Sequence, residues 1–165
     1  GHVIENGSIV LLGTEPSGAD LEYGWIALHA DAAQTIQPVT SFSEKPPASI
    51  ATRLLSSGAI WNTMVLVARA KDLLQLCNRH HSHVTAVFLR SLALEAVARA
   101  DVLAASYSTL PIVDFSRDVV ARERGLVAYT WPMSMGWSDL GTPERLSRWT
   151  RRTQDQLSSA QTLTT

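Results

Sequence analysis

The sequence predicts an α/β fold in which helices flank a β-sheet, and three observations support this. Short apolar segments typical of buried strands alternate with segments whose apolar residues recur at helical spacing. Glycines and prolines mark the boundaries between them. The length of 165 residues suggests one compact domain. This pattern leaves open whether the sheet is mixed or parallel.

Five segments have strand-like composition: Ile9–Leu12, Trp25–Leu28, Val39–Phe42, Ala59–Ala68 and Leu126–Trp131. The first ends at a turn-rich loop from Gly13 to Asp20, and loops in that position commonly carry ligand contacts. The third leads into Pro46-Pro47, which ends it because proline cannot donate to a β-ladder.

Helices are expected between these strands. The first spans Ala48 to about Ser56, with Gly58 placed to close it. The others are expected around Leu73–Cys77, around Val84–Leu92, from Arg117 to Glu123, and after Thr142-Pro143, where a hydroxyl cap precedes a proline. The stretch from Ser158 is polar, and we expect it to be frayed.

The composition excludes several functional classes. There are 15 acidic and 14 basic side chains, so we expect no broad nucleic-acid or anionic lipid surface. No apolar run reaches the length of a membrane span. Cys77 is the only cysteine, which rules out a disulfide within the chain and fits a cytoplasmic location. The P-loop, the nucleophile elbow and the dinucleotide fingerprint are not found in the sequence.

Glu44 and Lys45 stand side by side at the expected end of a strand. The carboxylate could accept hydrogen bonds from two sugar hydroxyls, and the ammonium could neutralise a phosphate. A solvated pair is the commoner outcome for such neighbours. Gly24, between two aromatic residues, could let a sugar ring rest on the backbone or could simply begin a strand. Asn62, inside an apolar strand, needs partners that could be sugar hydroxyls or backbone groups.

Asp139 lies in the segment Trp137-Ser138-Asp139-Leu140-Gly141, before an expected helix start. It could bind a hard cation through oxygen, or make a local turn or cap bond. His80 and His83 could share a helix face, but no third ligand is evident, so we favour a solvated helix end.

In order along the chain, these segments resemble the mannose-1-phosphate guanylyltransferases, a family of sugar-1-phosphate nucleotidyltransferases. The matching segments are Glu22-Tyr23-Gly24-Trp25-Ile26, Phe42-Ser43-Glu44-Lys45-Pro46, Trp61-Asn62-Thr63, Leu110-Pro111 with Asp114 to Asp118, and Gly136-Trp137-Ser138-Asp139-Leu140-Gly141-Thr142. The resemblance covers about Ile9 to Trp149.

The resemblance implies that a sugar 1-phosphate attacks the α-phosphorus of a nucleoside triphosphate, with Mg²⁺ neutralising charge. It implies that Glu44 holds sugar hydroxyls, that Lys45 holds the phosphate as a catalytic residue, and that Gly24 and Asn62 line the sugar site. Asp139 would be a catalytic aspartate that binds the metal. The implied fold is a mixed sheet flanked by helices, a partial nucleotide-diphospho-sugar transferase (Rossmann-like) fold.

The sequence departs from the family in several places. The family's glycine-rich nucleotide loop is not found, so the resemblance implies its C-terminal half only: residues 1–157 as the sugar-phosphate half and 158–165 as a tail. Met64 stands where the family has glycine, and so does Glu22 in many members. Three readings follow: a fragment inactive alone, a split enzyme whose partner chain supplies the nucleotide half, or a non-catalytic binding or assembly module. Each predicts an exposed sheet edge, and hence a homo-oligomer or a partner.

Overall fold

A computed structural model describes residues 8–29, 35–132, 134 and 136–162. The chain forms two units, residues 1–131 and residues 132–165. Residues 163–165 of the expected tail lie outside the described part, and residues 158–162 belong to a helix. None of the helices in the described ranges is long and apolar enough to cross a membrane.

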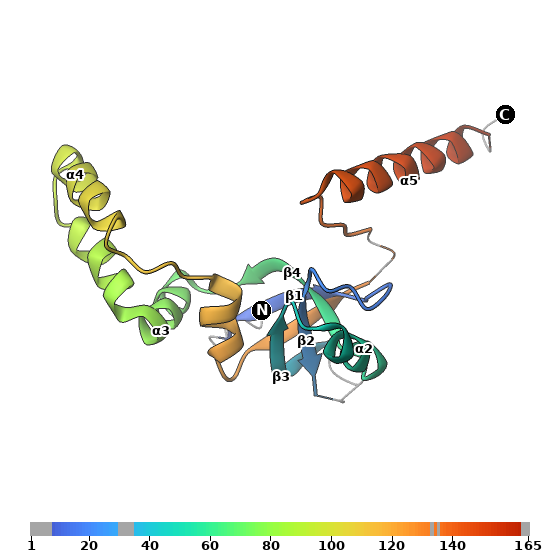
Figure 1. The fold of residues 1–165 in the computed structure, drawn as a ribbon, viewed down its shortest axis with the longest axis horizontal. Coiled ribbons are helices and arrows are strands. Elements are labelled where there is room, and N and C mark those ends of the chain that lie inside the picture. The colour runs from blue at the N-terminus through green and yellow to red at the C-terminus, as the bar shows by residue number, and fades with distance from the viewer. Residues whose placement is uncertain (1–7, 30–34, 133, 135, 163–165) are drawn as a thin grey trace. The chain divides into compact units, whose positions relative to one another are not determined.

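The first unit is built on five strands that close into a barrel (Figure 1). The strands are β1 (Val10–Thr14), β2 (Gly24–Leu28), β3 (Ile36–Glu44), β4 (Ile60–Val67) and β5 (Val127–Trp131). Their order is β1-β4-β2-β3-β5; β1 and β5 pair in parallel and the other neighbours pair antiparallel. The expected mixed sheet is therefore confirmed, whereas its closure into a barrel was not predicted. The expected exposed sheet edge is wrong for the described part of the chain, because each of the five strands pairs on both sides.

A continuous apolar core lies against one face of these strands. Its buried members are Ile9, Leu11, Ile26, Phe42, Ile60, Leu76, Val119, Val120, Leu126 and Ala128. On the opposite face of β2, Trp25 is completely buried. Helix α2 (Ala48–Ser56) contacts this strand, and Ala51 is its buried residue. Full burial of a side chain such as Ile26 contributes about 1.5–3 kcal/mol, so the side chains on both faces of β2 stabilise the fold.

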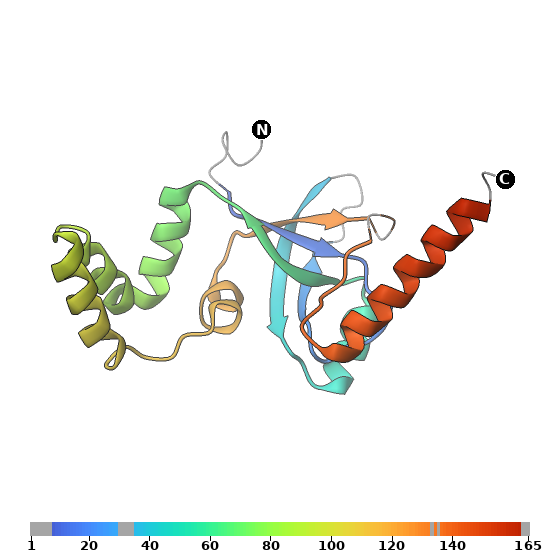
Figure 2. The same ribbon diagram turned by 90° about the horizontal axis from the view of Figure 1, so that it is seen from above.

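The helices of the first unit follow β4. Helix α3 (Ala70–Ser91) is interrupted at His81, whose φ of −141° and ψ of 57° are not helical. Two helices were expected in this region, and His81 separates them. Helix α4 (Ala96–Tyr107) contacts α3, with the rings of Phe88 and Tyr107 5.9 Å apart (Figure 2).

The short helix expected from Arg117 to Glu123 is two elements, the π-helical turn η1 (Phe115–Val119) and the 3-10 turn η2 (Val120–Arg122). The second unit contains α5 (Pro143–Thr162), which begins at the expected proline. Thr142 accepts a hydrogen bond from the Arg145 backbone N–H at 3.3 Å, as a helix cap does.

Three polar side chains fasten α3 to the end of η2, and we call them the Glu123 cluster: Arg79, His80 and Glu123. The guanidinium of Arg79 donates to both carboxylate oxygens of Glu123, at 3.1 and 3.3 Å. His80 Nε2 lies 2.8 Å from Glu123 Oε2. The predicted solvated helix end is therefore wrong for His80, whose side chain is only 18% exposed.

Candidate functional site

The structure brings together three of the residues that the sequence predicted to form a sugar site. Gly24, Glu44 and Asn62 come from the neighbouring strands β2, β3 and β4, and Gly24 pairs directly with Glu44. Residues alternate between the two faces of a strand, so all three share the face that carries the apolar core. They form the polar end of that face.

Gly24 leaves the space that the Glu44 side chain occupies. A Cβ atom at position 24 would lie 2.7 Å from Glu44 Oε2, 2.9 Å from Phe42 Cζ and 3.3 Å from Asn62 Cβ. A side chain at position 24 would therefore force Glu44 or Phe42 to move. The carboxylate of Glu44 therefore rests on the backbone of β2, close to Asn62.

The carboxylate of Glu44 is incompletely satisfied. Its Oε2 atom is buried and has no hydrogen-bond partner in the described part of the chain. Burial raises the pKa of Glu44, and the nearby negative charge of Asp114 raises it further. Lys45, the Ser116 hydroxyl and Arg117 oppose this rise without cancelling it. The site thus holds a poorly solvated acceptor that a donor group would stabilise.

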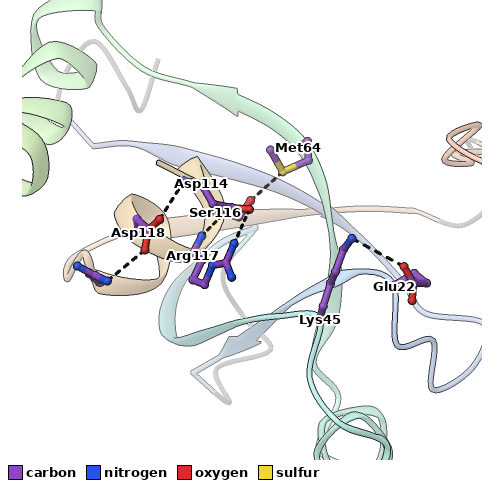
Figure 3. Close-up of polar contacts among 8 residues, drawn as sticks. Glu22, Lys45, Met64, Asp114, Ser116, Arg117 and Asp118 are labelled. Carbon is purple, nitrogen blue, oxygen red and sulfur yellow. Dashed lines mark hydrogen bonds and ion pairs between the residues drawn. The ribbon is translucent and has the colours of Figure 1, made fainter. Parts of the chain in front are cut away.

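Lys45 lies just beyond the end of β3, in a left-handed conformation with φ of 46°. Its Nζ is 3.8 Å from Glu22 Oε2, and both side chains are more than half exposed (Figure 3). The described contacts therefore pair Lys45 with Glu22, as a weak surface pair. Its ammonium remains accessible to a ligand beside Glu44.

Three further site residues come from η1 and its cap, and sequence reasoning assigned them no role: Asp114, Ser116 and Arg117. Asp114 caps the turn, accepting from the Arg117 backbone N–H at 2.9 Å and from the Arg117 guanidinium at 3.2 Å (Figure 3). Ser116 is 4% exposed. The segment from Asp114 to Asp118 was one of those that carried the resemblance, but nothing in the sequence placed this turn beside β3.

Asn62 and Met64 flank an irregularity in β4. The register with β1 shifts between Leu12, which pairs with Val65, and Gly13, which pairs with Asn62, so Thr63 and Met64 form a bulge. The Thr63 hydroxyl donates to Leu12 O at 2.6 Å and accepts from Val65 N at 3.3 Å, which replaces lost ladder bonds. Met64 has a φ of 62°.

The sulfur of Met64 joins the site to η1. Ser116 Oγ donates to Met64 Sδ at 3.1 Å (Figure 3). Asn62 Nδ2 donates to the same sulfur, also at 3.1 Å. Asn62 Oδ1 accepts from the Met64 backbone N–H at 3.3 Å. Within the described part of the chain, both of these bonds of the Asn62 amide therefore go to Met64, one to its backbone and one to its sulfur.

Asp139 belongs to the second unit and makes local contacts. Its Oδ1 accepts from the Gly141 N–H at 2.8 Å, and its Oδ2 lies 2.7 Å from Arg145 Nη1. Within the described ranges, no three His, Cys, Asp or Glu side chains gather as a metal site would require. One carboxylate already paired with a guanidinium does not by itself fit Mg²⁺, which takes several oxygen ligands.

Comparison with known proteins identifies the group to which this fold and site belong. The nucleotidyl transferase family profile matches residues 2–156. The chain is 31% identical to the alginate biosynthesis protein AlgA of Pseudomonas aeruginosa, over 86% of this chain and 30% of that protein. It is 26% identical to a candidate mannose-1-phosphate guanylyltransferase of Vibrio cholerae, over 84% and 30% of the two chains. The chain thus spans about 30% of the length of these curated relatives.

Solved structures agree with these relatives. A crystal structure described as mannose-1-phosphate geranyltransferase from Thermus thermophilus matches 76% of this chain and 36% of that one, with a TM-score of 0.64 and 26% identity. A mannose-6-phosphate isomerase structure from Helicobacter pylori shares the fold, with a TM-score of 0.61 and 16% identity over 78% and 51% of the two chains. Because the family profile covers nearly the whole sequence, this chain belongs to the nucleotidyl transferase family.

Proposed function

We propose that this chain binds a sugar 1-phosphate of the mannose 1-phosphate type and forms the sugar half of a nucleotidyltransferase. One observation carries the proposal: the buried, unpartnered Oε2 of Glu44, which lies against Gly24 and beside Asn62. A sugar hydroxyl is a neutral donor that would satisfy this oxygen.

Lys45 would hold the phosphate in this complex. Its ammonium stands at the exposed end of β3, next to the residue that takes the hydroxyls. The Lys45–Glu22 ion pair is exposed, and its atoms are 3.8 Å apart. Breaking it to bind a doubly charged phosphate would therefore cost little free energy. Arg117 lies close enough to Glu44 to affect its titration, and adds a second cation to the same region.

The nucleotide would be bound elsewhere, either by further residues of the same polypeptide or by another chain. The named relatives are about three times as long as the part that matches, which leaves room for a nucleotide half outside this chain. That the chain is the C-terminal half of a partial Rossmann-like fold rests on the order of its matching segments. Mg²⁺ supplies charge neutralisation when bound in this family. Asp139 would then release Arg145 and act together with carboxylate or phosphate oxygens from outside the described residues.

Calorimetric titration with mannose 1-phosphate tests the proposal on the wild type and on Lys45→Ala. We expect the Lys45 variant to bind at least about tenfold more weakly, because it loses the phosphate's counter-charge. Lys71→Ala is the matched control, since Lys71 is the other lysine of the sequence, is exposed on α3 and changes net charge equally. Equal affinities for the wild type and Lys45→Ala would contradict the role of Lys45.

A non-catalytic binding or assembly module is the second candidate function. The local pairing of Asp139 with Arg145 favours it, because a metal-binding aspartate would otherwise be expected to be available. The same titration with and without GTP and Mg²⁺ discriminates between the two. A wild type that binds no mannose 1-phosphate under any of these conditions would favour the module.

A further inference from the structure

Met64 has an unusual combination of properties for its position. Its backbone is left-handed, a conformation that costs a residue with a side chain about 1 kcal/mol and costs glycine almost nothing. Its side chain is 61% exposed, so apolar burial does not explain its presence. Yet its sulfur receives hydrogen bonds from two buried groups, Asn62 Nδ2 and Ser116 Oγ.

The sulfur is a poor match for these two donors. A thioether is a weak acceptor, whereas Asn62 is 7% exposed and Ser116 4% exposed, so both donors are largely removed from water. An oxygen acceptor in the same place would make stronger bonds with them. The Ser116 hydroxyl has a single proton, and Glu44 lies near enough to compete with Met64 for it.

The location of this contact connects it to the candidate site. A Cβ atom placed on Gly24 would lie 2.7 Å from Glu44 Oε2 and 3.3 Å from Asn62 Cβ, so these two side chains are neighbours above Gly24. The donors held by Met64 therefore belong to two residues that adjoin Glu44, Asn62 through this contact and Ser116 through its effect on the Glu44 carboxylate. Figure 3 shows the Met64 side chain extending from β4 toward Ser116 of η1, on the side of the barrel where these elements meet.

We propose that Met64 is an internal plug of the sugar site, whose thioether occupies the two donors that a ligand oxygen would take. The inference rests on the proposed function and deepens it, because it names what must move before the ligand binds. Displacement is feasible: the side chain is exposed, has three rotatable bonds and belongs to a bulge, so its movement leaves the apolar core intact.

Titration of mannose 1-phosphate into Met64→Ala and Met64→Leu tests the plug. Both variants keep a Cβ at the left-handed position, but only alanine opens the space. We expect Met64→Ala to bind about tenfold more tightly than the wild type, and Met64→Leu to bind no more tightly. Met64→Gly, which suits the backbone conformation, serves as a second opened variant if the alanine variant does not fold.

The Met64→Ala/Glu44→Gln double variant locates the binding and separates the two ideas. Equal affinity in the wild type and Met64→Ala, with binding lost in Glu44→Gln, would overturn the plug and leave the proposed function standing. Binding by none of the proteins would overturn the proposed function and the plug with it. Undiminished binding by the double variant would place the ligand elsewhere and overturn both.

A second measurement detects the plug directly in the wild type. Methyl NMR identifies the Met64 signal by its absence from the spectrum of Met64→Ala. We expect this signal to shift and sharpen when mannose 1-phosphate is added, because the methyl group leaves its contacts with Asn62 and Ser116. An unchanged signal at saturating ligand would contradict displacement.

Discussion

Glu44 shows how a single buried carboxylate can oppose the stability of the fold near neutral pH. Its Oε2 is buried without a partner, and burial, followed by the charge of Asp114, raises its pKa. An acid whose pKa is higher in the folded state contributes its full stabilisation at low pH. That contribution falls as pH rises through the interval between the unfolded and folded pKa values. Near neutral pH, the ionised carboxylate therefore lowers the free energy of unfolding.

The prediction is that Glu44→Gln melts a few degrees higher than the wild type at pH 7, by about 2–5 °C, and shows no gain near pH 4. Glutamine keeps the size of the side chain and removes the charge. Thermal denaturation followed by circular dichroism at the two pH values measures the effect. A variant less stable than the wild type at both pH values would show that the carboxylate stabilises the fold.

Ser116 illustrates what the sequence could and could not indicate at this scale. Gly24, Glu44 and Asn62 were identified because each residue type was unusual in its strand. Ser116 is an ordinary serine in a polar segment, and its importance comes from lying against Met64, 52 positions away. Contacts of that separation depend on how strands pair, which side-chain chemistry alone does not specify.

At the scale of elements, the Glu123 cluster joins a helix to the turn that positions Asp114 and Ser116. Burial alone would raise the pKa of Glu123, but hydrogen bonds from His80 and Arg79 outweigh burial and lower it. An acid with a lowered pKa stabilises the fold above its unfolded pKa, and that stabilisation is lost as pH falls through the folded pKa. The attachment of α3 should therefore weaken in acid.

We predict that Glu123→Gln lowers the free energy of unfolding by about 1–2 kcal/mol at pH 7, since charge-assisted hydrogen bonds are lost. The deficit should shrink as pH falls from about 5 to about 3, where the wild-type carboxylate protonates. Urea denaturation at each pH gives the values, with the exposed Glu15→Gln as control. A deficit that does not change with pH would exclude the charge as its source.

The bounds of some elements are determined by adjacent residues in the sequence, and those of others by pairing with distant strands. The helix Ala48–Ser56 has the predicted bounds because Pro47 precedes it and Gly58, with a φ of 77°, follows it. The expected strand Val39–Phe42 extends in both directions, to Ile36–Glu44, because pairing with β2 and β5 holds residues of low strand propensity. The sequence indicated neither that extension nor the bulge at Thr63–Met64.

At the scale of the whole molecule, apolar side chains remain exposed in the first unit. Val65 and Val67 of β4 are about half exposed, as are Leu74 and Leu89 of α3, and Ile112 is fully exposed. No residue of α4 is buried. Apolar surface of this extent commonly marks contact with another protein surface. The closed barrel leaves no free sheet edge in the described part, so the prediction of a homo-oligomer or a partner chain now rests on this apolar surface alone.

Sedimentation velocity over a hundredfold concentration range tests that prediction. We expect the sedimentation coefficient to rise with concentration, because the exposed apolar side chains would be buried between copies. The double substitution Val65→Thr and Val67→Thr should shift the association to higher concentration by about tenfold. A single monomeric species throughout the range would contradict self-association. Only the second alternative, a different partner chain, would then remain.

The parallel pairing of β1 with β5 has a consequence for biosynthesis. β1 ends at Thr14, yet the strand beside it is complete only at Trp131. As the chain leaves the ribosome, more than a hundred residues must emerge before the barrel can close, while the open borders of β1 and β3 remain able to pair with other chains. Such distant contacts also slow folding. Premature termination anywhere before Trp131 would therefore give an aggregation-prone product rather than a smaller functional one.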